Sequence, residues 1–425
     1  MTALEARLAA EFGAAQVDVC TARAGGALCT WPRLTPPDVD AVAAALRFAG
    51  REQLRIVPAG AATHLYRTPE ASRADFVLSL RGLDRVREYE PEDMVAVVEA
   101  GTTLAALDAL ASPYAQRLGP DPWPGGGATL GGAVAANRTG IARRSRGTWR
   151  DAVLGARVLH ADGRSSKTGG KVVKNVTGFD LAKLYVGSCG TLVLLTEINL
   201  RLVPRPPVAG TLVTVQAAGR LPAALAALAA GPFAPASCTA LQGNLGFVQR
   251  EFLPPVPADA VCLVLRFEGR DAVVRAQLDA ACALLDGIEL DAARGLELDA
   301  ALRAACEPAA EGVLARIRAL PTALPAVLAA CRQHLGADVR VLGMVGAGEV
   351  LVHAPDLPPA PAAAWRQSLH AAGARVRIEA GPGSGAALHD DGDPVAAGLA
   401  RGIKRALDPA GRFAGEAVPA AGERS

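Results

Sequence analysis

The order of apolar and polar residues predicts alternating helices and strands through the first half of the 425-residue chain. Leu4, Leu8 and Phe12 recur four residues apart, which predicts an amphipathic helix that ends near Gly13. A second helix is expected to start after Asp38 and to run to about residue 50. Such alternation favours a layered α/β or α+β domain. Further strands are predicted at 54–57, 76–80, 94–99, 151–160 and 192–202, and further helices at 104–110 and 179–185.

The pattern changes after the proline-rich segment 204–207, which we interpret as a domain boundary. Beyond it, the apolar runs predict a smaller α+β unit in which helices cover one face of a sheet. A last helix, 393–405, is expected to stop before Asp408 and Pro409, because proline cannot continue a helix. Between the proline-rich segment and this last helix, the pattern predicts strands at 212–215 and 261–267, helices at 272–285 and 325–335, and a hairpin of 339–345 with 349–353.

Composition describes an ordinary globular protein, since 51% of the residues are hydrophobic and 20% are charged. A formal net charge of +2 and the lack of a dense basic tract argue against a nucleic-acid partner. The apolar stretch 221–236 is interrupted by prolines and is too short to span a bilayer. No signal peptide is recognised, so the sequence predicts a cytoplasmic protein. The eight cysteines are scattered without a CxxC pair, so neither a metal site nor a disulfide framework is expected.

The segment 124–137 carries the most specific chemistry. Five glycines and one threonine stand directly before an alanine-rich helix start. Glycine lets the backbone approach a ligand closely, and the N–H groups at a helix start attract an anion. The segment is therefore typical of a diphosphate cradle, although a glycine-rich surface turn would explain such a run equally well if it stood alone.

Four separated segments, in order along the chain, are similar to the flavoprotein family typified by vanillyl-alcohol oxidase and the bacterial D-lactate and glycolate oxidases. They are the loop 57–65, the stretch 90–104, the glycine run with its continuation to Gly147, and the stretch 169–198. This resemblance implies an α+β fold that holds FAD in an extended conformation. The implied division is a two-part PCMH-type FAD-binding domain at residues 1–206, an α+β cap domain at 207–380, and a C-terminal return helix and tail at 381–425.

By this resemblance, the backbone amides of residues 59–63 and 125–132 bind the diphosphate of FAD. Gly190 and the strand of Glu197 and Ile198 would lie against the adenine or flavin edges. The candidate cofactor-binding residues are Ala59, Gly60, Ala61, Ala62, Thr63, Gly125, Gly126, Gly127, Thr129, Gly131, Gly132, Asn137, Gly140, Gly147, Gly190, Glu197 and Ile198.

The first of these loops departs from the family pattern, because Ala61 and Ala62 replace two glycines. Wherever the backbone needs a positive φ, an alanine costs about 1 kcal/mol, which loosens the loop without abolishing it. His64 is a candidate covalent anchor for the flavin, but it matches a variable position of the family. Noncovalent FAD is therefore expected.

A departure in the second half of the chain bears on catalysis. Relatives that oxidise 2-hydroxy acids carry two histidines in a glycine-rich segment, and the matching run 343–351 has Met344 and Leu351 at those places. Neither side chain can accept a proton from a hydroxyl group, so no catalytic residue and no metal ligand is assigned. His353 and the acidic run 389–393 are expected to be structural or exposed.

With these replacements the chain most resembles the second, FAD-binding flavoprotein of the bacterial glycolate oxidase complex. That resemblance implies an FAD-binding subunit that supports oxidation of glycolate or D-lactate and electron transfer. Its partners would be a catalytic flavoprotein subunit and an iron–sulfur subunit, through which it would reach the membrane periphery. Two alternatives stay open: a self-sufficient FAD-dependent dehydrogenase of a 2-hydroxy acid or alcohol, and a flavin-free assembly subunit.

Overall fold

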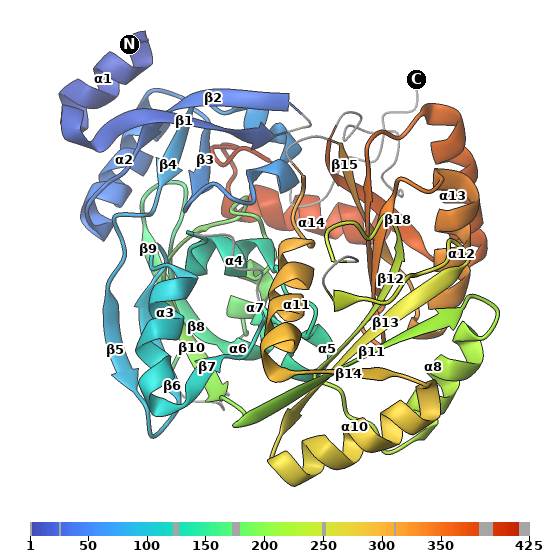
Figure 1. Ribbon diagram of the computed structural model, residues 1–425. Helices are drawn as coiled ribbons and strands as arrows, with labels where there is room; N and C mark the ends of the chain where they lie inside the picture. The colour runs from blue at the N-terminus through green and yellow to red at the C-terminus, as the bar shows by residue number, and fades with distance from the viewer. Residues whose placement is uncertain are drawn as a thin grey trace.

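The computed structural model of the chain describes residues 2–24, 27–121, 127–171, 179–248, 252–309, 312–381 and 394–415. Its strands form three sheets with helices packed on them, so the predicted α+β class is confirmed (Figure 1). We call the two smaller sheets and their helices the N-terminal part, and the eight-stranded sheet and its helices the cap.

The first sheet of the N-terminal part contains β1 (Val17–Ala24), β2 (Ala27–Leu34), β3 (Ile56–Ala59) and β4 (Phe76–Ser79), accompanied by α1 (Ala3–Phe12) and α2 (Val39–Arg51). Its strand order is β1-β2-β4-β3. Both predicted helices are confirmed, and Asp38 caps α2 by accepting a hydrogen bond from the Ala41 amide at 2.8 Å. The antiparallel pairing of β1 with β2 was not predicted, because these strands mix polar and apolar residues without a clear period.

The second sheet consists of β5 (Val86–Glu90), β6 (Val95–Glu99), β8 (Val153–Leu159), β9 (Ser165–Gly169) and β10 (Leu194–Pro204), with β7 (Gln116–Leu118) paired to β10. Its helices are α3 (Leu104–Ala111), α4 (Leu130–Ala136), α5 (Arg143–Arg146), α6 (Trp149–Ala152) and α7 (Ala182–Tyr185). One core joins both sheets, because Leu46, Phe76 and Ile198 belong to the same buried cluster. The strand predicted at 151–160 starts only after α6, and the helix predicted at 179–185 shortens to α7.

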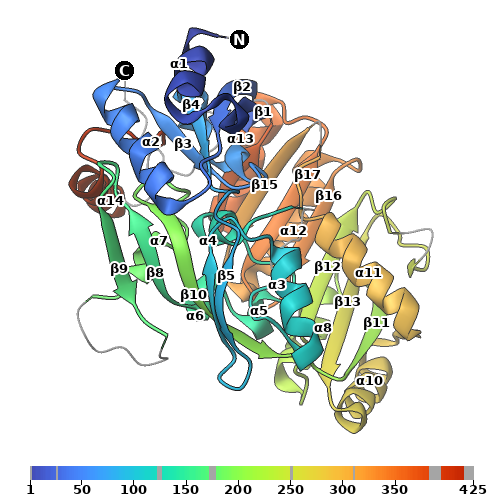
Figure 2. The ribbon, with the colours of Figure 1, turned by 90° about the vertical axis from the view of Figure 1, so that its left-hand side faces the viewer.

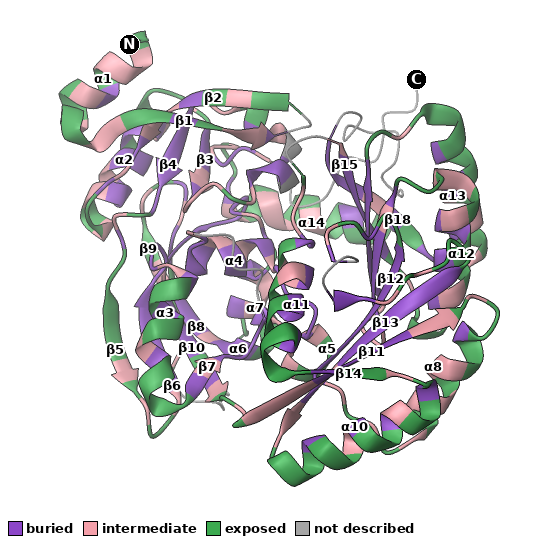
Figure 3. Ribbon diagram, in the orientation of Figure 1, coloured by how far each residue is buried: buried purple, intermediate pink, exposed green. Residues whose placement is uncertain are grey.

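The cap sheet has the order β14-β11-β13-β12-β16-β17-β15-β18, and all of its neighbouring strands are antiparallel. The strands are β11 (Val208–Ala217), β12 (Ser237–Gly243), β13 (Ala260–Gly269), β14 (Ile288–Leu290), β15 (Val313–Arg318), β16 (Arg340–Met344), β17 (Glu349–Ala354) and β18 (Arg375–Ala380). The predicted hairpin of β16 and β17 is confirmed. In Figure 3 the central strands are buried, whereas the helices expose their outer faces.

The expectation that helices cover one face of this sheet is only partly right. One face packs against α8 (Leu221–Ala230), α10 (Asp271–Leu285), α12 (Leu324–Leu335) and α13 (Pro359–Ala371). On the opposite face, Leu298 and Leu302 of α11 (Ala292–Ala304) share a buried cluster with Tyr66 and Ile141 of the N-terminal part. The second face therefore packs against the N-terminal part, as the side view of Figure 2 also shows, and α11 lies at this contact.

The C-terminal segment returns to the first sheet. After α14 (Pro394–Leu407), the chain runs beside β3, where the Ile56 amide donates to the Arg412 carbonyl at 2.8 Å and the Ala414 amide donates to the Ile56 carbonyl at 2.7 Å. Lys404 donates to the Thr191 carbonyl at 2.7 Å. The last described residues thus form hydrogen bonds with β3, the strand that leads into the loop of residues 60–63.

Candidate functional site

A loop with unsatisfied backbone donors follows β3. The N–H groups of Gly60, Ala61, Ala62 and Thr63 have no acceptor among the residues that the structure describes. Ala62 has a φ of 60°, in the left-handed region, so the loop bends sharply at that residue. Consecutive backbone N–H groups in such a bend form a concavity that suits an anion.

The start of α4 forms the facing wall, but its own donors are already used. The Leu130 amide donates to the Thr102 carbonyl at 2.8 Å, and the Gly131 amide donates to the Ala100 carbonyl at 2.8 Å. The Gly132 amide donates to the Thr129 hydroxyl, the N-cap of α4, at 3.3 Å. Within the expected cradle 125–132, the amides of residues 130, 131 and 132 therefore donate inside the protein, whereas the four amides of the loop after β3 do not.

The glycines of these two walls have a packing role. A Cβ on Gly60 would lie 1.9 Å from the Thr129 hydroxyl oxygen, and a Cβ on Gly131 would lie 2.7 Å from the Ala100 Cβ. Neither distance is possible for a real side chain, so glycine is required for the loop and the helix to touch. Both glycines were identified from the sequence, and the structure gives this reason for them.

Between the walls lies a cleft with an empty volume of about 690 Å³, its open mouth included. Of the predicted site residues, the structure brings Ala59, Gly60, Ala61, Ala62, Thr63, Thr129, Gly131, Gly132 and Gly190 to its lining. A Cβ on Gly127 would lie 4.0 Å from the Ala61 Cβ, whereas Gly125 and Gly126 lie outside the described residues.

The cleft also has lining residues that the sequence did not single out. They are mostly apolar residues of neighbouring elements, such as Leu80, Ala135, Cys189 and Val193. Cys189 and Gly190 follow one another at φ 52° and 71°, which turns the chain under Pro58. No motif marks such residues, because any small or apolar side chain would serve at a wall of this kind.

Five predicted site residues lie away from the cleft lining. Asn137 ends α4 at a φ of 47°, and its Oδ1 atom is buried without a hydrogen-bond partner among the described residues. A Cβ on Gly140 would lie 2.0 Å from the Asp121 carbonyl oxygen, and Gly147 has a φ of 75°. Glu197 pairs with Arg157 at 3.2 Å, and Ile198 is a fully buried core residue of β10.

A buried ion cluster joins the N-terminal part to the cap beside this site. Arg138 pairs with Glu379 at 3.2 Å, and Arg316 donates to the same carboxylate at 2.7 Å. Glu349 accepts from Arg143 at 3.0 Å and also pairs with Arg316. Arg138 also donates to the Cys306 carbonyl at 3.1 Å. Three guanidinium groups thus share two carboxylates, and all of these side chains except that of Arg143 are at most 8% exposed.

Two further groups near Arg138 have displaced pKa values. Burial lowers the pKa of His353 to about 3, so that its ring stays neutral, and its Nε2 atom has no hydrogen-bond partner among the described residues. Burial raises the pKa of Glu307 to about 7, although Arg138 opposes the shift. A group with a pKa near 7 can exchange protons at neutral pH, whereas a ring with a pKa of about 3 is a weak base.

The two positions that the family resemblance matches to histidines lie on one face of the cap sheet. Met344 and Leu351 are 2% and 0% exposed, in the cluster that also contains Tyr66. Within the described ranges, no three His, Cys, Asp or Glu side chains gather as a metal site would require. No helix of the described residues is long and apolar enough to cross a membrane. The acidic run 389–393 lies outside the described residues.

Residues 33–169 match the family model described as FAD binding domain. Glycolate oxidase subunit GlcD of Bacillus subtilis is 32% identical over 184 residues, which are 43% of this chain and 39% of that protein. Glycolate oxidase subunit GlcE of Escherichia coli is 41% identical over 119 residues, 28% of this chain and 34% of that protein. D-lactate dehydrogenase of Archaeoglobus fulgidus is 35% identical over 171 residues, 40% of this chain and 38% of that protein.

These matches therefore span less than half of the length of the curated relatives. A solved structure of alkyldihydroxyacetonephosphate synthase has the same fold, with a TM-score of 0.67 at 15% identity over 90% of this chain and 76% of that one. Residues 33–169 of the chain thus match an FAD-binding domain, and FAD is the cofactor. The free amides of residues 60–63 suit the diphosphate of that cofactor.

Proposed function

We propose that this chain is the FAD-binding subunit of a glycolate-oxidase-like complex that oxidises a 2-hydroxy acid such as glycolate or D-lactate. The matches to GlcD and GlcE support this proposal, and its partners would be a catalytic flavoprotein subunit and an iron–sulfur subunit. We place it in the cytoplasm, in contact with a membrane only through these partners. We also divide it at residues 206 and 380, as the sequence suggests.

One observation carries the proposal. Where relatives that oxidise hydroxy acids have histidines, the cap presents Met344 and Leu351, both buried and without a titratable atom. The nearby carboxylates of Glu349 and Glu379 are paired with arginines, so their charges are already compensated within the protein. Removal of a proton from a hydroxyl group needs a base of suitable pKa. We therefore assign the full catalytic set to the partner subunit.

In this proposal the chain's own residues bind and orient the cofactor. The amides of Gly60, Ala61, Ala62 and Thr63 donate to its diphosphate, and the close packing of Thr129 under Gly60 fixes the shape of the loop. Among the described residues that line the cleft there is no lysine or arginine, so backbone dipoles supply the attraction in this proposal. Bound FAD supplies a two-electron acceptor that also releases electrons singly. Its attachment is proposed to be noncovalent.

Glu307 supports the alternative of a self-sufficient dehydrogenase. Its raised pKa of about 7 suits a general base, and it lies near Arg138 at the contact with the N-terminal part. Under this alternative, Glu307 would accept the hydroxyl proton of the substrate, and the chain would reduce its own flavin without a partner.

Anaerobic reduction of the flavin separates the two functions. The purified chain should hold FAD that dissociates on acid precipitation, and neither glycolate nor D-lactate should bleach the flavin absorbance. Bleaching should occur once the catalytic subunit is added. If the chain alone is bleached by either acid, and if Glu307→Gln abolishes this, the self-sufficient dehydrogenase is correct. If the chain takes up no FAD even when FAD is added, it is an assembly subunit.

A further inference from the structure

Asp121 occupies a special place at the root of the glycine-rich segment. It is the last described residue before 122–126, and its backbone carbonyl packs so closely on Gly140 that a Cβ there would lie only 2.0 Å away. Its side chain is 2% exposed. The carboxylate accepts from the Ala142 amide at 3.3 Å and from Arg146 at 3.0 Å. These contacts connect the two ends of the segment that contains α4.

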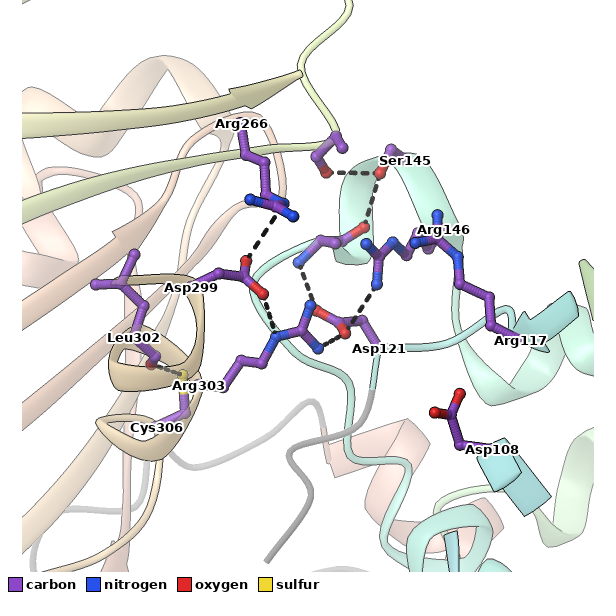
Figure 4. Close-up of polar contacts among 12 residues, drawn as sticks. Asp108, Arg117, Asp121, Ser145, Arg146, Arg266, Asp299, Leu302, Arg303 and Cys306 are labelled. Atoms are coloured by element: carbon purple, nitrogen blue, oxygen red, sulfur yellow. Dashed lines mark hydrogen bonds and ion pairs between the residues drawn. The ribbon is translucent and has the colours of Figure 1, made fainter. Parts of the chain in front are cut away.

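The cap supplies a third partner to the same carboxylate. Arg303, in the last turn of α11, forms an ion pair with Asp121 across the contact between the two parts of the molecule (Figure 4). Arg303 is itself oriented by Asp299, one turn earlier, which accepts from its Nε atom at 2.7 Å. Figure 4 shows Arg303 between Asp299 of the cap and Asp121, which precedes the glycine-rich segment.

A second contact strengthens this connection. Arg146, the other cation at Asp121, also donates to Glu268 of the cap strand β13 at 2.6 Å. We call Asp121, Arg146, Glu268, Asp299 and Arg303 the Asp121 cluster. Its charges alternate across the contact, and all five side chains are at most 18% exposed. Burial lowers the pKa of Arg303 to about 10, so its guanidinium stays charged at neutral pH.

A buried carboxylate that loses one of its cationic partners is left with uncompensated charge, and the structure around it must move to restore solvation. At Asp121 that movement would reach Gly140 and the residues on both sides of α4, because the backbone there is in contact with them. The wall formed by Thr129 and Gly131 belongs to the same segment and lines the cofactor cleft. Cap docking and the shape of the cleft are thus connected through one carboxylate.

We propose that Arg303 of the cap is a positioning residue for the FAD site, which it supports through Asp121, so that FAD binding and cap docking stabilise each other. This inference rests on the FAD-binding part of the proposed function and is independent of the substrate. Arg303 lies outside residues 33–169, so the family match does not include it. The coupling is reciprocal, because whatever tightens the cap must tighten FAD to the same extent.

The test is FAD titration of the full-length apoprotein, followed by flavin fluorescence. Arg303→Met removes the charge and keeps the length of the side chain. Its FAD dissociation constant should rise about 5- to 150-fold, the usual range of coupling between two sites. Arg303→Lys keeps the positive charge, so its FAD dissociation constant should lie between those of Arg303→Met and the unchanged protein. Arg275→Met is the control, because Arg275 pairs on the exposed surface with Asp279 of α10 and Glu289 of β14, neither of which belongs to the cluster.

A merely structural role of Arg303 is distinguished by two further readouts. FAD should raise the Tm of Arg303→Met by less than it raises the Tm of the unchanged protein, whereas a structural loss would lower both melting curves equally. In a double-mutant cycle, Asp121→Asn should weaken FAD binding little further once Arg303 is methionine. Equal FAD affinity in Arg303→Met, or fully additive effects of the two substitutions, would overturn the inference. Failure of the unchanged protein to bind FAD would instead refute the proposed function.

Discussion

Arg138 and Glu379 form an ion pair of 3.2 Å in which both side chains are at most 3% exposed. The two residues are 241 positions apart, one just after α4 and the other in the last strand of the cap. Arg316 donates to the same carboxylate at 2.7 and 3.1 Å, so Glu379 compensates two buried cations at once. This carboxylate therefore joins the two parts of the molecule through buried charges.

Glu379→Gln should therefore destabilise the protein strongly. The substitution leaves Arg138 and Arg316 buried with one carboxylate fewer, and removal of one partner of a buried pair costs about 3–5 kcal/mol. Urea denaturation of the apoprotein measures the change in free energy of unfolding. Glu289→Gln is the matched control, because Glu289 pairs with Arg275 at the surface, where a pair contributes about 0–1 kcal/mol. Equal losses in the two variants would contradict this account.

The sequence predicted those parts of the fold that local pattern determines. The helix after Asp38 and the hairpin of β16 and β17 are confirmed, because periodicity and capping residues specify them without help from distant residues. The β1–β2 hairpin and α11 escaped prediction for the opposite reason. Their residues alternate weakly, and α11 is held in place by contacts of Leu298 and Leu302 with the cap sheet and the N-terminal part.

At the site, too, the sequence predicted features that local motifs determine and missed those that depend on contacts between distant residues. Gly60 and Gly131 were recognised from their motifs, and both line the cleft. The Asp121 cluster was not recognised, because Asp121 and Arg303 are 182 positions apart and each is an ordinary charged residue in the sequence. Only the packing of the cap against the N-terminal part reveals that they meet. Ion pairs of this kind carry no local signal.

Ala62→Gly should stabilise the protein. Ala62 has a φ of 60°, and a left-handed backbone costs a non-glycine residue about 1–2 kcal/mol, whereas glycine loses about 0.5–1 kcal/mol in chain entropy. The free energy of unfolding should thus rise by about 0.5–1 kcal/mol, as measured by urea denaturation without FAD. Ala61→Gly, next to it and without a positive φ, should instead lower it by a similar amount. The same sign for both variants would refute the strain at Ala62.

Gly60→Ala should damage both the fold of the loop and FAD binding. The new Cβ would lie 1.9 Å from the Thr129 hydroxyl oxygen, so the loop must move away from α4. Overpacking of this kind costs about 1–3 kcal/mol, and the displaced amides of residues 60–63 would no longer converge on the diphosphate. FAD retention after gel filtration checks this result. Gly170→Ala is the control, since among the described residues no atom beyond its two chain neighbours lies within 4 Å of a Cβ there. FAD loss from that variant would show that glycine replacement acts nonspecifically.

The stability of the protein should depend on pH through His353. Its pKa is about 3 in the folded protein, because of burial and the nearby Arg340 and Arg138, against 6.5 for an unperturbed histidine. Between pH 3 and pH 6.5, His353 is protonated in the unfolded chain but neutral in the folded protein. The contribution of His353 to the free energy of unfolding is therefore complete above pH 6.5 and is lost as the pH falls. From pH 7 to pH 5.5 it should decrease by about 1 kcal/mol.

The raised pKa of Glu307 has the opposite effect to that of His353. The contribution of Glu307 to the free energy of unfolding is lost as the pH rises from 4.5 to about 7. The change in the free energy of unfolding of the unchanged protein between the two pH values therefore combines both groups. The contribution of His353 is obtained by subtracting the change measured for His353→Gln. In urea denaturation at the two pH values, this variant should lose about 1 kcal/mol less than the unchanged protein. Identical pH dependence in both proteins would mean that His353 is charged in the folded state, and the neutral ring beside Arg340 would be ruled out.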